Sequence, residues 1–184
     1  MLVSCACLPW SFDQVLHLVR RLRLFLVSGS IIPILVNERF EQVLPGIIRE
    51  PLSGVQAICP IGSSLTDPEL ELPVWIASPE KTVSNLTYAS VLPASSFPPH
   101  TRSINLPGFT ATVLELLKAL EAVGGKKALD LVHFEASELD KRIVQTWPSK
   151  FDITQALQMG FTGDNDGVLP IVQQFKKDLE ENKV

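Results

Sequence analysis

The chain has 184 residues, of which 46% are hydrophobic and 20% are charged, and its formal net charge is −4. This length suits one domain of ordinary size, and the hydrophobic fraction is large enough to form a core. The composition excludes an intrinsically disordered chain and a collagen-like fibre, and the weakly acidic balance argues against a nucleic-acid-binding protein.

The first forty residues contain one predicted helix and the most apolar run of the chain. Residues 11–23 have helical spacing, with three arginines near the C-terminal end, where the helix dipole favours cations. The run at 24–36 is shorter than the ~20 residues of a membrane span, so we predict a core strand or a strand pair there. The opening segment lacks the basic stretch of a secretory signal, and Cys5, Cys7 and Cys59 lack metal-ligand spacing. These features predict a cytoplasmic protein with no membrane partner.

Strand-like and helix-like segments alternate along the rest of the chain, which favours the α/β class. The predicted strands cover residues 55–60, 72–77, 102–106 and 129–134, and a loop rich in Gly, Ser, Asp and Pro covers 61–71. The predicted helices cover residues 79–92, 113–123, 137–147, 152–160 and 167–180.

Two of these helices have clear signals at their ends. Ser78 precedes proline and glutamate, which is a typical helix start. Thr112 with Glu115 predicts a capping box, and Gly124-Gly125 predicts a left-handed stop. These two glycines follow a predicted helix, whereas a phosphate-binding loop needs glycines ahead of one.

The sequence contains few residues that indicate catalysis. No Gly-x-Ser-x-Gly elbow accompanies the three histidines, and His133 is expected to be a core or edge residue of a strand. The segment from Asp164 to Gly167 lacks the final glutamate of a calcium loop and predicts a turn and a helix cap. The Asn85 sequon is expected to carry no glycan.

Features that bind and use a nicotinamide cofactor are also absent from this sequence. No glycine-rich loop follows a predicted strand, and the fourth residue after Tyr88 is leucine, where a Tyr-x-x-x-Lys dyad would need lysine. The residues therefore predict neither a catalytic group nor a cofactor-binding group in this chain.

Several ordered motifs nevertheless resemble a known family. They are Gly46-Ile47-Ile48-Arg49-Glu50-Pro51-Leu52-Ser53-Gly54, Pro73-Val74-Trp75-Ile76-Ala77-Ser78-Pro79, Ile104-Asn105-Leu106-Pro107-Gly108, Arg142-Ile143-Val144 with Trp147-Pro148, and Ala156-Leu157-Gln158-Met159-Gly160-Phe161. Their order over residues 40–179 is similar to the C-terminal half of NAD-dependent epimerase/dehydratase proteins, within the extended short-chain dehydrogenase superfamily. The D-erythronate dehydrogenase-like branch is the nearest in pattern.

The resemblance implies an α/β fold made of the substrate-binding C-terminal part of such an enzyme, with an incomplete Rossmann sheet. Residues 40–184 would be the substrate-binding region, and residues 1–39 a divergent remnant or replacement of the end of the Rossmann domain. It implies NAD for the family, although this chain as given is expected to bind no cofactor.

The resemblance also implies two substrate-binding residues, Arg49 and Arg142. A guanidinium suits a carboxylate because it offers a planar fork of donors. The alternative for each arginine is a surface ion pair, with Glu50 or Glu138. Trp75 and Trp147 are expected to pack in the core rather than against a sugar.

Two functions remain open at this point. One is a truncated family member whose relatives oxidise or epimerise a small sugar acid or sugar derivative with NAD. The other is a non-catalytic binding protein that pairs with a second copy or with a full-length relative, or a mis-spliced product. Whether the chain is itself an enzyme stays undecided.

Overall fold

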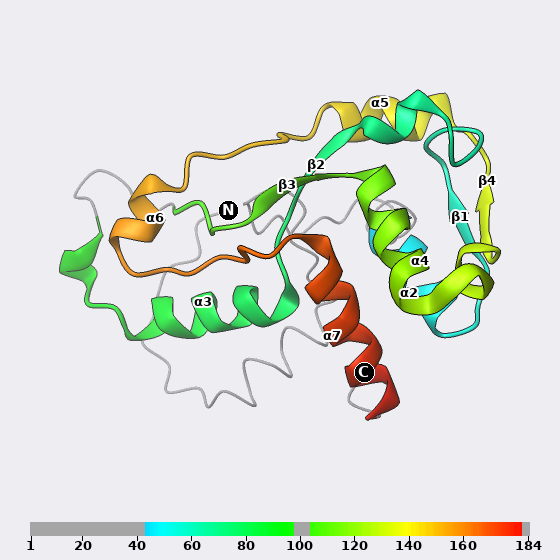
Figure 1. Cartoon of the computed structure of the whole chain (residues 1–184). Helices are drawn as coiled ribbons and strands as arrows, with labels where there is room; N and C mark the ends of the chain where they lie inside the picture. The colour runs from blue at the N-terminus through cyan, green and yellow to red at the C-terminus, as the bar shows by residue number, and fades with distance from the viewer. Residues whose placement is uncertain (1–42, 98–103, 182–184) are drawn as a thin grey trace. The chain divides into compact units, whose positions relative to one another are not determined.

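The computed structural model describes residues 43–97 and 104–181 of the chain (Figure 1). They form two compact units, the first made of residues 75–97, 104–109 and 150–164, and the second of 43–74, 110–149 and 165–181. The predictions for residues 11–23 and 24–36, and for the division at residue 39, concern segments that lie outside the described residues, wholly or in part.

The second unit contains a small parallel sheet and most of the helices. Its elements are α2 (Val43–Leu52), β1 (Ala57–Cys59), the short 3₁₀ helix η1 (Pro68–Glu71), α4 (Val113–Leu129), β4 (Val132–Phe134), α5 (Glu138–Gln145) and α7 (Val168–Glu180). Strands β1 and β4 are parallel, with Ala57 opposite Val132 and Cys59 opposite Phe134. This parallel pair and the surrounding helices confirm the expected α/β class.

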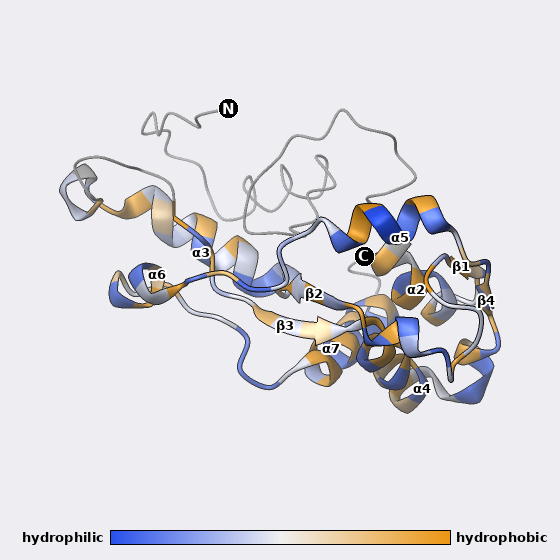
Figure 2. Ribbon diagram, turned by 90° about the horizontal axis from the view of Figure 1, so that it is seen from above, coloured by the Kyte–Doolittle hydropathy of each residue, from blue (hydrophilic) through white to orange (hydrophobic). Residues whose placement is uncertain are grey.

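The core of the second unit lies around α4, which packs against α2 and α7. The spacing of its apolar residues explains this position, since Leu116, Leu117 and Leu120 share one face and are buried. Ile47 of α2 and Val172 of α7 complete this core. In Figure 2 hydrophobic and hydrophilic residues alternate along α5, of which only Val144 is buried.

The first unit contains α3 (Pro79–Val91), the 3₁₀ helix η2 (Ala94–Ser96) and α6 (Thr154–Gln158). Strands β2 (Pro73–Ile76) and β3 (Phe109–Thr112) pair with each other, and the division between the units falls within both strands. The predicted starts of α3 and α4 are confirmed. Ser78 accepts a hydrogen bond from the Lys81 amide, and Thr112 and Glu115 form the full capping box.

The strand predicted at 102–106 is wrong over its described residues, because the strand begins at Phe109. Pro107 has no amide hydrogen to donate to a sheet. Gly108 lies so close to β2 that an added Cβ would come within 2.5 Å of the Ile76 carbonyl oxygen. Strand pairing therefore starts after this tight Pro-Gly passage.

The stop predicted at Gly124-Gly125 is a break inside a longer element. Gly125 has a φ of 71° and a ψ of −178°, which interrupts the helix, but helical turns resume and end at Leu129. Lys176 of α7 donates a hydrogen bond of 3.0 Å to the Val123 carbonyl oxygen beside this break. Because Leu129 is helical, the predicted strand at 129–134 is shortened to β4.

Within the described residues, no helix combines the length and the apolar character needed to cross a membrane.

Candidate functional site

Arg49 and Arg142, which the family resemblance implies as substrate-binding residues, lie on different helices of the second unit. Arg49 is in the last turn of α2 and is half-buried, whereas Arg142 is on the exposed surface of α5. Among the residues that the structure describes, no carboxylate forms an ion pair with Arg142, and Glu138 lies 3.5 Å from the Lys141 ammonium instead. The predicted Glu138 partner of Arg142 is therefore engaged by the neighbouring lysine.

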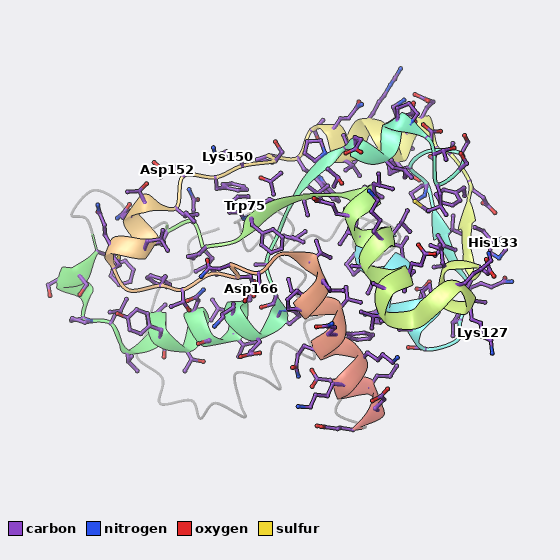
Figure 3. All side chains as sticks on the ribbon, in the orientation of Figure 1. Trp75, Lys127, His133, Lys150, Asp152 and Asp166 are labelled. Carbon is purple, nitrogen blue, oxygen red and sulfur yellow. The ribbon has the colours of Figure 1, made fainter. Side chains whose placement is uncertain are left out.

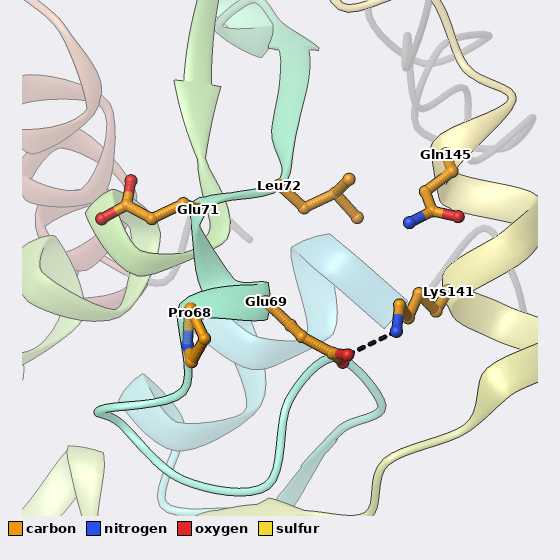
Figure 4. A pocket seen from close by; sticks show the side chains of 6 residues that line it. All are labelled: Pro68, Glu69, Glu71, Leu72, Lys141 and Gln145. Atoms are coloured by element: carbon orange, nitrogen blue, oxygen red, sulfur yellow. Dashed lines mark hydrogen bonds and ion pairs between the residues drawn. The ribbon is translucent and has the colours of Figure 1, made fainter.

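A shallow pocket of about 260 Å³ lies between η1 and α5 (Figure 4). Its lining residues are Pro68, Glu69, Glu71, Leu72, Lys141 and Gln145. Neither Arg49 nor Arg142 lines this pocket. The basic residue of α5 that faces it is Lys141, one position before the arginine that the resemblance selects.

Electrostatic attraction holds Lys141 at the wall of the pocket. Its ammonium donates hydrogen bonds to Glu69 of η1 and, more weakly, to Glu138 of its own helix. The hydrogen bond to Glu69, followed by the charge of Glu138, raises the pKa of Lys141 above its ordinary value. The Lys141 side chain is only 22% exposed. Its hydrogen bond to Glu69 connects α5 to η1 at this point.

Asp67 fixes the start of η1 and hence the position of Glu69. One of its carboxylate oxygens accepts the Glu69 amide at 3.0 Å, and the other accepts the amide and hydroxyl of Ser63, both at 2.8 Å. These hydrogen bonds, led by the one from Glu69, lower the pKa of Asp67. Sequence reasoning treated this segment as a plain loop. An aspartate directly before Pro68 was the available signal for a helix start.

A second polar cluster lies in the first unit, at the start of α3. Asp164 accepts hydrogen bonds from both the amide and the hydroxyl of Ser78, each at 2.7 Å. A carboxylate is favourable there because the helix dipole places positive charge at the N-terminus. The segment from Asp164 to Gly167 does end in the N-cap of α7, as predicted, but the cap residue is Gly167, which makes no side-chain hydrogen bond, and the Asp164 carboxylate binds at α3 instead.

Asn85 joins α3 to the segment that follows α6. Its amide nitrogen donates to the Thr162 carbonyl oxygen at 2.7 Å, and its amide oxygen accepts the Thr162 amide at 3.0 Å. The residue is 2% exposed. Both polar atoms of the side-chain amide are therefore engaged in hydrogen bonds in the folded protein, so the sequon asparagine has a structural role.

The remaining chemically interesting side chains have structural roles or lie at the surface. Trp75 is buried, as predicted. Its ring lies edge-on to that of Phe151, with the ring centroids 5.5 Å apart, beside the segment of Lys150 and Asp152 (Figure 3). His133 is exposed on β4. Cys59 is buried, and burial raises the pKa of its thiol. In the described part of the chain no three His, Cys, Asp or Glu side chains are grouped to hold a metal.

Two curated relatives match most of this chain. The D-erythronate dehydrogenase of Haemophilus influenzae is 39% identical over 140 residues, which is 76% of this chain and 41% of that protein. The D-erythronate dehydrogenase of Cupriavidus necator is 35% identical over 128 residues, which is 70% of this chain and 37% of that protein. The chain thus spans about two fifths of the length of these relatives. No family model matches it.

Two solved structures superpose on this chain. A nucleoside-diphosphate-sugar epimerase from Agrobacterium tumefaciens superposes with a TM-score of 0.66 and 26% identity, covering 87% of this chain and 42% of the other. A GalE-like L-threonine dehydrogenase from Cupriavidus necator superposes with a TM-score of 0.54 and 15% identity, over 73% and 40% of the two chains, and shares the fold. Over the region that it shares with these proteins, the chain is therefore similar to members of the NAD-dependent epimerase/dehydratase family.

Proposed function

We propose that this chain is the substrate-binding region of an NAD-dependent dehydrogenase or epimerase that acts on a small sugar acid. The observation that carries the proposal is the 39% identity, over 140 residues, to a D-erythronate dehydrogenase. The motifs that resemble the C-terminal half of the family lie within this chain, while the glycine-rich loop and the Tyr-x-x-x-Lys dyad have no counterpart in its sequence.

In this proposal the chain supplies substrate contacts, and the bound NAD belongs to family members that have the glycine-rich loop. Arg142 is the first candidate for the substrate carboxylate. Its guanidinium is exposed and has no carboxylate partner among the described residues, so its planar fork of donors is available for a bidentate contact. Arg49, half-buried in the last turn of α2, is the second candidate.

A binding experiment on the full chain tests the role of Arg142. Calorimetric titration with D-erythronate should show binding that the Arg142→Gln variant weakens by at least about tenfold, since a charged bidentate hydrogen bond is lost. Lys127→Gln removes one exposed positive charge from α4 and is the matched control. Equal affinities of the two variants would remove Arg142 from the site.

The proposal also predicts that the isolated chain does not turn over. Purified protein mixed with NAD and four- to six-carbon sugar acids should give no sustained rise in the absorbance of the reduced cofactor. Turnover that persists after removal of contaminating dehydrogenases would show that the chain carries its own cofactor site and would overturn this division of roles.

The alternative function is that of a non-catalytic partner protein, which pairs with a second copy or with a full-length relative. It is supported by exposed apolar side chains in the second unit, such as Val55 at 55% and Ile58 at 54%. Light scattering after size-exclusion chromatography separates the cases, because a cooperatively folding monomer needs no partner. We assign either function to the reducing cytoplasm, where the buried thiol of Cys59 would stay free.

A further inference from the structure

The pocket between η1 and α5 is lined by polar groups from both elements. The Glu69 carboxylate and the Lys141 ammonium are in direct contact as an ion pair at its wall, and Gln145 follows Lys141 by one helical turn on the same side of α5 (Figure 4). Among the described residues, no hydrogen bond engages the Gln145 amide. The Leu72 side chain extends toward α5 and gives the pocket an apolar wall (Figure 4).

The charges of this pocket select against an ionic ligand. Lys141 already binds two carboxylates, and Glu71 adds another acidic side chain to the lining, so an anion would meet a surplus of negative charge. A metal ion is also disfavoured, since the described residues hold no group of three metal-ligating side chains. A neutral ligand avoids both penalties.

Hydroxyl groups match the hydrogen-bonding capacity that remains. An ammonium has three donors, and Lys141 uses two of them, while a carboxylate such as Glu69 can accept several hydrogen bonds. Neighbouring hydroxyls can donate to Glu69 and accept from Lys141 or from the Gln145 amide, and the carbon chain between them can rest on Leu72. The pocket volume of about 260 Å³ leaves room for a small polyol.

We propose that this pocket binds a small neutral polyol or sugar through Glu69, Lys141 and Gln145, at a site separate from the contact assigned to Arg142. The pocket is shallow and open, so the expected affinity is millimolar. The site does not depend on the proposed function. A neutral ligand has no carboxylate and therefore does not need Arg142.

Backbone amide chemical shifts of the isotope-labelled full chain test the site, with erythritol as the probe. Titration to about 100 mM should move the signals of residues 68–72 and 141–145 in a saturable way. Gln145→Ala should weaken this binding at least severalfold, and Glu69→Gln about tenfold, because a charged acceptor is lost. Gln158→Ala, an exposed glutamine at the end of α6, is the matched control and should leave the binding unchanged.

The outcomes are distinguishable from those of the erythronate experiment. Arg142→Gln should leave erythritol binding unchanged while weakening D-erythronate binding. Shifts that stay absent, that spread evenly over the chain, or that survive both Gln145→Ala and Glu69→Gln would overturn the polyol site and leave the role of Arg142 untouched. Equal thermal midpoints of wild type and Gln145→Ala ensure that lost binding does not reflect unfolding.

Discussion

Replacing Asn85 by alanine should destabilise the first unit by about 1–3 kcal/mol. The substitution removes two hydrogen bonds, of 2.7 and 3.0 Å, between the buried amide and the backbone of Thr162. Each such bond contributes about 0.5–1.5 kcal/mol net, and their sum gives the stated range. The two hydrogen bonds are only part-buried, so water can solvate the freed backbone groups and the loss stays within this range. Urea unfolding, followed by tryptophan fluorescence, measures the change because Trp75 belongs to the same unit.

Asn105 offers a matched control within that unit. Its side chain also donates to a backbone carbonyl, that of Asp152 at 3.0 Å, but it is exposed and makes this one bond. Asn105→Ala should therefore change the free energy of unfolding by no more than about 0.5 kcal/mol, as is usual for surface substitutions. Equal effects of the two substitutions, or an Asn85→Ala variant as stable as wild type, would refute the view that the double hydrogen bond holds this segment.

Four further predictions address the second unit. Gly125→Ala should cost about 1–3 kcal/mol in urea unfolding, because a φ of 71° with a ψ of −178° is strained for any residue with a Cβ. Thr112→Ala should cost about 1 kcal/mol and lower the thermal midpoint, since the capping box is lost. Asp67→Asn should destabilise the protein near neutral pH but not in acid: the folded-state pKa of Asp67 is lowered, so its contribution is complete above the unfolded value of about 3.9 and disappears as the pH falls through the folded value. Thermal midpoints of both proteins across the acid range should converge at the lowest pH, and a constant gap would contradict this assignment. Cys59 should react with iodoacetamide far more slowly in native protein than in denaturant, as peptide mass spectrometry would show, because burial raises the pKa of its thiol.

Local signals in the sequence were sufficient to predict most of the secondary structure. The N-cap at Ser78 and the capping box at Thr112 follow from hydroxyl and carboxylate chemistry within four residues, and the structure contains both. The apolar stripe of α4 gave its buried face in the same way. Residues 104–106 were mistaken for a strand because apolar composition alone does not reveal that Gly108 must pass tightly against Trp75 and Ile76.

Contacts between distant segments could not be predicted, because no local pattern encodes them. The segment that contains Asp164 was expected to form only a turn and a helix cap, yet the Asp164 carboxylate binds Ser78, which lies 86 positions earlier. Asn85 was identified only as a glycosylation sequon, although its amide is committed to Thr162, 77 positions away. Each partner is a backbone or hydroxyl group that is present at many positions, so the choice depends on the folded geometry.

The adjacent basic residues of α5 show how family resemblance and geometry supply different information. Consecutive residues of an α-helix point about 100° apart, so Lys141 and Arg142 cannot face the same pocket wall. Lys141 faces η1, where Glu69 neutralises it, whereas Arg142 stays exposed without a carboxylate partner among the described residues. Neutralisation makes Lys141 a poor receptor for an anion and a good donor to hydroxyls, while the unpaired guanidinium favours a carboxylate. Exchanging the two residues should therefore weaken both kinds of binding, because lysine at 142 loses the planar fork and arginine at 141 replaces the compact ammonium that Glu69 and Glu138 hold with a planar guanidinium.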